Sequence, residues 1–270
     1  MTVGSNLSKV LLALWLLFAH PMIVQAQPAV DLELALAVDA SGSVSAHRFH
    51  LQQQGYAAAF RHPDVLKAIR SGATQSIAVI MYQWTGPSLQ IVSVPWHRIH
   101  DLTSAEAFAA AIAEAPRQLF GGGTSISGAI DYGVTLFPMS GHGSARRIID
   151  ISGDGINNSG RAVMQARDEA VRAGITINGL PILALEPSLD RYFQEYVIGG
   201  PGAFTIPAAD FETFGEAIRR KLILEIASSA RPSKALTEKR WAKPFAGLPD
   251  SMPVEKANSG GERRSWQMSE

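Results

Sequence analysis

The chain has 270 residues, of which 46% are hydrophobic, and 24 basic side chains balance 24 acidic ones. This composition predicts one medium-sized globular domain with a hydrophobic core and shorter flanking segments. A net charge of zero argues against nucleic acid as a partner, because nucleic-acid binding needs a basic face. Cysteine is absent, which excludes disulfide bonds and thiolate catalysis.

Residues 1–26 have the pattern of a secretory signal peptide. Lys9 precedes the apolar stretch Val10–Ala19, and the exit sequence Val-Gln-Ala ends at Ala26. The apolar stretch is shorter than the roughly 20 residues that a bilayer-spanning helix needs; an uncleaved anchor or a buried helix is the alternative. We expect cleavage after Ala26 and export of the mature protein, periplasmic or secreted, with no stable membrane span.

From Val30 onward, short apolar runs alternate with stretches of helical spacing. The predicted strands are 31–39, 76–84, 89–96, 147–152, 176–183 and 203–207. The predicted helices are 45–61, 103–115, 125–137, 161–173, 189–197 and 211–227. The connection "TGPS" after Trp84 is short enough for a hairpin, which gives one antiparallel edge strand. The alternation predicts an α/β fold with a doubly wound, mostly parallel central sheet and helices on both faces.

The composition changes after Ser228, where Pro, Gly and charged residues are scattered without periodicity. We predict that residues 229–270 form a disordered C-terminal tail. Its large apolar anchors, Trp241, Phe245 and Trp266, could dock on the domain or on a partner. The predicted organisation is therefore a signal peptide (1–26), a domain (27–228) and a tail (229–270).

Three loops attract attention because ligands of an open parallel sheet bind beyond the carboxyl ends of its strands. They are "DASGS" at 39–43, "FGGGTSIS" at 120–127 and "ISGDGINNSG" at 151–160. If the strands that precede the first and third loops lie side by side, all three loops meet at one edge of the sheet.

The polar side chains of these loops offer oxygen atoms only. They are Asp39, Ser41, Ser43, Thr124 and Asp154. Such a set suits a hard divalent ion, Mg²⁺ above all, or Mn²⁺. The alternate spacing in 39–43 lets Asp39, Ser41 and Ser43 point the same way. Because the set contains only two carboxylates, the ion would keep an open coordination position. A carboxylate brought by a partner would fill that position.

Residues near the predicted ligands are expected to support the site. Small residues that let the backbone bend around an ion are Gly42, Gly123, Gly153 and Gly155. Asp150, inside the strand before the third loop, either supports the site from behind the ligands or makes a strand-end hydrogen bond.

Each of these features has an ordinary alternative. Asp or Ser after a strand and Thr before a helix are common turn and cap residues, and only their occurrence on three ordered loops favours a metal site. The pairs His47/His50 and His97/His100 lack companion ligands for zinc and are predicted to lie on the surface. The glycine-rich loop lacks the Gly-Lys-Ser/Thr ending of a phosphate-binding loop.

The three motifs "DASGS", "GGGTS" and "ISGDG" resemble the metal-ion-dependent adhesion site (MIDAS) of von Willebrand factor type A (VWA) domains, in order and spacing, over roughly residues 30–227. The segments "GDGINNSG", "ITINGLPI" and "VIGGPGAF" are similar, more narrowly, to a bacterial exported family with this fold and no assigned function. The resemblance implies a doubly wound domain that binds proteins through magnesium without catalysis. It assigns Asp39, Ser41 and Ser43 to the first loop's ligands, Thr124 to the second's and Asp154 to the third's. The sequence departs from that family at Tyr196, where a cysteine is expected.

The leading hypothesis is thus an exported, non-catalytic protein-binding module that uses a divalent metal to bind a partner's Asp or Glu carboxylate. A metal-assisted, phosphatase-like hydrolase using the same ion is the alternative. Against it, the sequence has no second carboxylate cluster, no nucleophile with a base and no basic clamp for phosphate. A structural domain with a vestigial site is a third hypothesis.

Overall fold

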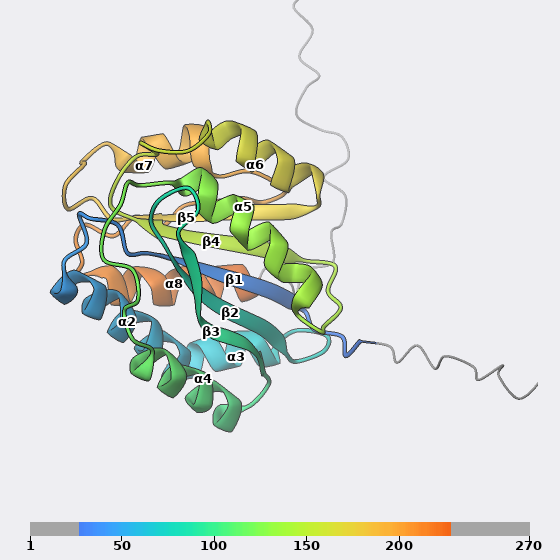
Figure 1. Cartoon of the computed structure of the whole chain (residues 1–270). Coiled ribbons are helices and arrows are strands. Elements are labelled where there is room, and N and C mark those ends of the chain that lie inside the picture. Colours follow the sequence, from blue (N-terminus) through green and yellow to red (C-terminus); the bar gives the residue numbers. More distant parts are fainter. Residues whose placement is uncertain (1–26, 228–270) are drawn as a thin grey trace, which may run out of the picture. The chain divides into compact units, whose positions relative to one another are not determined.

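The computed structural model of the chain describes residues 27–227 (Figure 1). The predicted signal peptide and the predicted tail lie outside the described residues. The strands are β1 (Leu32–Asp39), β2 (Ile77–Trp84), β3 (Gln90–Ile99), β4 (Arg147–Gly153) and β5 (Ile175–Pro181). The α-helices are α2 (Ala46–Arg61), α3 (Pro63–Arg70), α4 (Leu102–Glu114), α5 (Ile126–Leu136), α6 (Val163–Arg172), α7 (Leu189–Tyr192) and α8 (Phe214–Ala227). A 3₁₀ turn (Phe137–Met139) follows α5, and a π-helical turn (Phe193–Val197) follows α7.

The five strands form one sheet in the order β3-β2-β1-β4-β5. β1 pairs in parallel with both β2 and β4, and β4 pairs in parallel with β5. β3 is antiparallel to β2 and lies at the edge. The doubly wound, mostly parallel sheet with one antiparallel edge strand is therefore confirmed.

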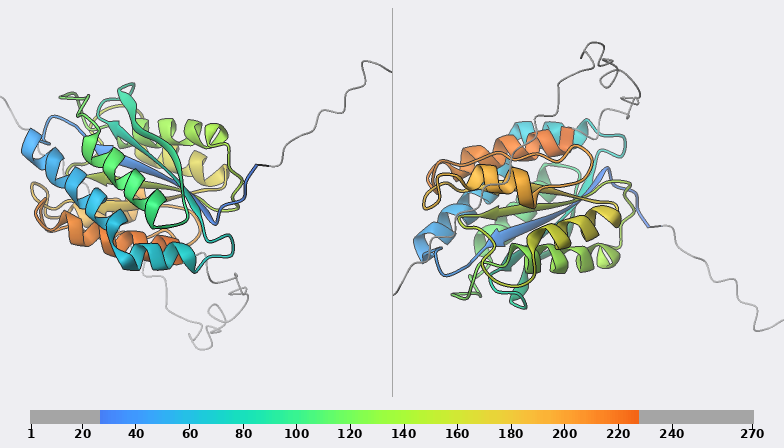
Figure 2. Two further views of the ribbon diagram at one scale, coloured as in Figure 1. Left: turned by 90° about the horizontal axis from the view of Figure 1, so that it is seen from below. Right: turned by 90° about the horizontal axis from the view of Figure 1, so that it is seen from above.

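β1 lies in the middle of the sheet, and all of its residues are buried. Its side chains alternate between two hydrophobic cores, with Leu34 and Leu36 in one and Ala35 and Ala37 in the other. The leucine side is covered by α2, α3, α4 and α8, which lie together in the view from below (Figure 2). The alanine side is covered by α5, α6 and α7. Helices on both faces explain the nearly continuous apolar runs of the strands.

Three local predictions were wrong. The helix α3 is missing from the predicted elements: His62 caps it by accepting a hydrogen bond from Asp64 N through Nδ1 at 3.2 Å, and proline fits its first turn. Residues 203–207 make an isolated bridge between Thr205 and Gly179 instead of a strand. The helix α4 begins at Leu102, one residue before the predicted start at Thr103, because Asp101 and Ser104 form its capping box.

Candidate metal centre

The central pairing of the sheet brings the first and third loops together. β1 and β4 are parallel neighbours, and Val38 is in register with Ser152. Asp39 ends β1, and Asp154 follows directly after β4. The two aspartates therefore leave the same edge of the sheet side by side, as the sequence predicted for these loops.

The first loop turns tightly after β1 and is held by its own polar side chains. Ser41 N donates a hydrogen bond of 2.7 Å to Asp39 Oδ1, the side-chain-to-backbone pattern of an Asx turn. Ser41 Oγ and Ser43 Oγ are 3.1 Å apart. Ser45 then caps α2 by accepting a hydrogen bond from Arg48 N at 3.2 Å. Asp39, Ser41 and Ser43 thus point to one small volume.

The third loop joins that volume through Asp154. Ser43 Oγ donates a hydrogen bond of 2.6 Å to Asp154 Oδ1. Asp154 N donates a longer one, 3.4 Å, to Asp39 Oδ2. Asp39, Ser41 and Asp154 are all buried, and Ser43 is half-buried. Four of the five predicted ligands therefore form one hydrogen-bonded group.

The second loop attaches Thr124 to the third loop through hydrogen bonds of its backbone. Thr124 N donates to Asn158 Oδ1 at 2.8 Å, and Asn158 N donates to Thr124 O at 2.9 Å. The Thr124 hydroxyl lies near Gly155, where an added Cβ would be 3.6 Å from Thr124 Oγ1. Gly123 packs tightly against Ser159, whose Oγ would lie 2.6 Å from an added Cβ. Thr124 is thus placed beside Gly155, the residue after Asp154, while no hydrogen bond within residues 27–227 joins its side chain to the other four predicted ligands.

The charges in this group are not balanced by the side chains that touch them. Burial, and next the nearby Asp154 carboxylate, raise the pKa of Asp39 to about 7. Asp154 Oδ2 is buried and receives no hydrogen bond from the described residues. The Arg48 Nη1 atom is 3.8 Å from it, too far for a hydrogen bond. Two buried carboxylates and three hydroxyl oxygens fit a hard divalent cation, which would compensate their charge.

The supporting glycines differ in how much they are needed. An added Cβ at Gly153 would lie 3.1 Å from Asp39 Oδ2 and 3.2 Å from Trp84 Cζ2, closer than most Cβ contacts, so that a neighbouring group would have to shift slightly. At Gly42 and at Gly155 an added Cβ would be no closer than 3.6 Å to another atom, an ordinary contact. Of Gly42, Gly153 and Gly155, Gly153 is therefore the most closely packed, and its nearest neighbour is Asp39.

Asp150 belongs to a different buried cluster, on the side of the sheet that α8 covers. Its Oδ1 atom is 2.5 Å from Lys221 Nζ, which is also 2.5 Å from Glu225 Oε1. No hydrogen bond or ion pair connects Asp150 with the five predicted ligands within residues 27–227. Support of the site by Asp150 stays a prediction.

Several residues that hold the loops are not evident from the sequence. They are Arg48, Gln52, Arg117, Asn157 and Asn158. Gln52 Nε2 donates to Asp39 O at 3.1 Å, and Arg117 Nη2 donates to Ala40 O at 3.1 Å. The paired asparagines after "GDG" are a usable signal, because Asn side chains often bond to nearby loop backbone. The other three act across the sequence, and no local pattern identifies them.

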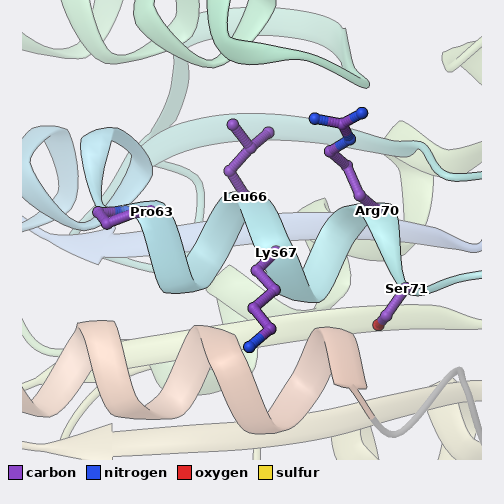
Figure 3. Close-up of a pocket in the computed structure, with 5 residues that line it drawn as sticks. All are labelled: Pro63, Leu66, Lys67, Arg70 and Ser71. Carbon is purple, nitrogen blue, oxygen red and sulfur yellow. The ribbon is translucent and has the colours of Figure 1, made fainter.

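Other surface features offer no comparable site. Within the described residues, no group of three or more His, Asp or Glu side chains is placed to hold a metal. A groove on α3 is lined by Pro63, Leu66, Lys67, Arg70 and Ser71 (Figure 3). Its two cations and lack of carboxylates do not suit a divalent cation.

Solved structures share this fold at low sequence identity. Proximal thread matrix protein 1 from the mussel byssus, in a structure with a zinc-occupied MIDAS motif, gives a TM-score of 0.52 at 13% identity, covering 74% of this chain and 47% of that chain. The pilus adhesin SpaC from Lactobacillus rhamnosus GG, in its open conformation, gives 0.51 at 14% identity, covering 76% of this chain and 30% of that chain. This chain therefore spans about half the length of the mussel protein and less of the adhesin.

A third solved structure and a family model complete the comparisons. A von Willebrand factor type A protein from Catenulispora acidiphila is also similar, with a TM-score of 0.47 at 17% identity, covering 75% of this chain and 43% of that chain. The chain has a VWA-like fold, as predicted from its motifs. No curated protein matches it. A family model described as "Protein of unknown function (DUF1194)" matches residues 29–230, and the chain belongs to this family.

Proposed function

We propose that this protein is an exported, non-catalytic protein-binding module whose divalent ion binds a partner carboxylate. The ion is Mg²⁺ or Mn²⁺, held by Asp39, Ser41, Ser43, Thr124 and Asp154. The observation that carries the proposal is the contact between two buried aspartates at one edge of the sheet: Asp154 N donates to Asp39 Oδ2, and Ser43 Oγ donates to Asp154 Oδ1. One of their oxygens, Asp154 Oδ2, accepts no hydrogen bond within the described residues. A divalent cation would supply the missing partner.

The charge count supports binding of an anionic group. Two carboxylates balance the two charges of the ion, and the remaining proposed ligands are neutral hydroxyls. Arg48 and Arg117 add positive charge nearby: Arg48 reaches Ser43 O at 2.9 Å, and Arg117 lies close enough to Asp39 to interact with its charge. A partner carboxylate would complete the coordination of the ion and meet a positive field.

The same residues give less support to the hydrolase alternative. The hydroxyl of Ser43 is committed to Asp154, and that of Ser41 lies against Ser43. No histidine within residues 27–227 forms a hydrogen bond with either serine or with Thr124. A metal-assisted hydrolysis would also need a group that holds the substrate through its transition state. We therefore propose binding without turnover.

Export is proposed from residues 1–26 alone. Within residues 27–227, none of the helices combines the length and the apolar character needed to cross a bilayer. We propose that cleavage after Ala26 releases the domain into the periplasm or the medium. The C-terminal tail over residues 229–270 likewise stays a prediction from composition.

Thermal unfolding of the mature chain, from Gln27 to Glu270, tests the metal site. The melting temperature is measured with chelator and then with Mg²⁺ or Mn²⁺. An ion at 100 times its dissociation constant stabilises the fold by about 2.7 kcal/mol, which raises Tm by roughly 5–10 °C for a domain of this size. Asp39→Asn should lose this rise, because it removes a ligand charge while keeping an oxygen that accepts from Ser41 N.

Asp168→Asn is the matched control, since Asp168 is exposed on α6 and pairs with Arg167 at 2.8 Å. It should keep the full response to the ion. If neither ion raises Tm at millimolar concentration and calorimetric titration detects no binding, the proposal is wrong. Metal-dependent hydrolysis of a phosphate ester that disappears in Asp39→Asn would favour the hydrolase alternative instead.

A further inference from the structure

Arg48 lies next to two of the proposed metal ligands, Ser43 and Asp154. It lies in the first turn of α2, and its Nη1 atom donates a hydrogen bond of 2.9 Å to Ser43 O. The same atom is 3.8 Å from Asp154 Oδ2. The Arg48 side chain is 31% exposed, whereas the Asp154 side chain is fully buried. Arg48 is thus a partly exposed cation that lies close to a buried carboxylate of the proposed site.

Besides its hydrogen bond to Ser43 O, Arg48 makes two weak contacts. Its guanidinium lies over the ring of Phe211, 5.1 Å from the centroid, in a partly exposed cation–π contact. Its ion pair with Asp154 is too long to include a hydrogen bond. When a stronger cation reaches Asp154, the Arg48 guanidinium can move away from it, because the loss of these two weak contacts costs little free energy.

We propose that Arg48 is a built-in competitor of the divalent ion at Asp154 and thereby sets the metal affinity of the site. This inference rests on the proposed function. A monovalent cation a few ångströms from a divalent one weakens its binding by about tenfold, even with the dielectric constant of water. The positive charge of Arg48 therefore repels the ion and weakens its binding. A partner carboxylate that binds near both cations reduces this repulsion. Metal and partner carboxylate would then bind cooperatively.

The test is titration calorimetry of the mature chain with Mn²⁺ alone. Arg48→Met removes the charge and keeps an apolar stem over Phe211, and Arg48→Gln is a second neutral variant. Both should bind Mn²⁺ about tenfold more tightly than the parent. Arg48→Lys keeps the charge and should stay within about threefold of the parent. Arg191→Met, at an exposed arginine on α7, is the control and should change nothing.

The outcomes separate this inference from the proposed function. If the parent binds Mn²⁺ and the neutral variants bind it equally or more weakly, Arg48 only supports the loop and the inference is overturned. If only the neutral variants bind measurably, both proposals are supported. If no variant binds Mn²⁺ while all of them unfold cooperatively with similar Tm values, both are overturned.

Discussion

Ser43 Oγ donates a hydrogen bond of 2.6 Å to Asp154 Oδ1, although 111 residues separate the two in sequence. This bond joins the loop after β1 to the loop after β4, whose strands already lie side by side in the sheet. The second loop has a different attachment, because Thr124 is held through the backbone and side chain of Asn158. Strand pairing and this hydrogen bond hold the first and third loops together, and such preorganisation lowers the cost of binding an ion.

The attachment of Thr124 leads to a prediction about Asn158. Asn158→Ala removes the side-chain oxygen that accepts from Thr124 N at 2.8 Å. Thr124 should then be held less firmly against the third loop, and the affinity for Mn²⁺ should fall by about tenfold, as with other residues that orient metal ligands. Titration calorimetry with Mn²⁺ measures the change, and thermal unfolding in chelator checks that the fold is intact.

Ser159→Ala is the matched control in the same turn. Ser159 Oγ is buried and has no hydrogen-bond partner within the described residues, so its removal should leave the affinity for Mn²⁺ within about twofold. An equal loss of affinity in both variants would mean that the turn acts through its packing. In that case the bond from Asn158 to Thr124 would have no special part in metal binding.

Much of the candidate site could be predicted from the sequence because the chemistry is local. In 39–43, polar residues follow an apolar strand directly, and parallel strands deliver their ends to one edge of the sheet. The residues that fix the geometry were harder to find. Arg48 contacts Ser43 and Asp154 from a helix, and such contacts depend on how α2 packs against the sheet, which no residue spacing encodes.

The fold shows the same division. Buried strands such as β1 and β2 were evident because both faces are covered and the apolar run is nearly continuous. The helix α3 was missed because a proline directly after α2 suggests a break, whereas here it opens a second helix. Residues 203–207 have strand-like composition and do lie beside β5, but they pair with it only through an isolated bridge between Thr205 and Gly179. Gly200 and Gly202, just before them, adopt left-handed φ values that favour turns.

The contact between Gly153 and Asp39 leads to a second prediction. Gly153→Ala would place a Cβ 3.1 Å from Asp39 Oδ2 and 3.2 Å from Trp84 Cζ2, so the carboxylate or the indole must shift. Overpacking of this kind costs about 1–3 kcal/mol. We expect a lower free energy of unfolding in urea and a smaller rise in Tm with Mg²⁺.

Gly155→Ala gives the comparison, because its Cβ would lie 3.6 Å from Thr124 Oγ1, an ordinary van der Waals distance. Its free energy of unfolding should stay within about 0.5 kcal/mol of the parent, and its response to Mg²⁺ should be kept. If the two alanine variants behave alike, the loops relax around a methyl group and the close approach at Gly153 is not a constraint on the site.

The third prediction concerns pH and the buried cluster of Asp150, Lys221 and Glu225. Here one ammonium faces two carboxylates, and Asn178 Nδ2 donates to Glu225 Oε1 at 2.7 Å. Burial, and next the charge of Asp150, raise the pKa of Glu225 to about 7. The folded state therefore holds a proton that the unfolded chain, with an ordinary carboxyl pKa of 4.5, releases at lower pH.

The sign of the effect follows from that difference. Because the folded pKa of Glu225 is raised, its contribution to stability is present below about pH 4.5 and is lost as the pH rises toward 7. Glu225→Gln keeps the oxygen that accepts from Asn178 and Lys221 but carries no charge. Relative to the parent, the variant should gain on the order of 2–3 kcal/mol in unfolding free energy between pH 4.5 and pH 8.

Urea unfolding in chelator at several pH values between 4.5 and 8 measures this difference, and Glu195→Gln serves as the exposed control. The control should show a difference from the parent that does not change with pH. A constant difference for Glu225→Gln as well would show that Glu225 is ionised throughout this range. The single ammonium of Lys221 would then satisfy both carboxylates, and the cluster would need no proton at neutral pH.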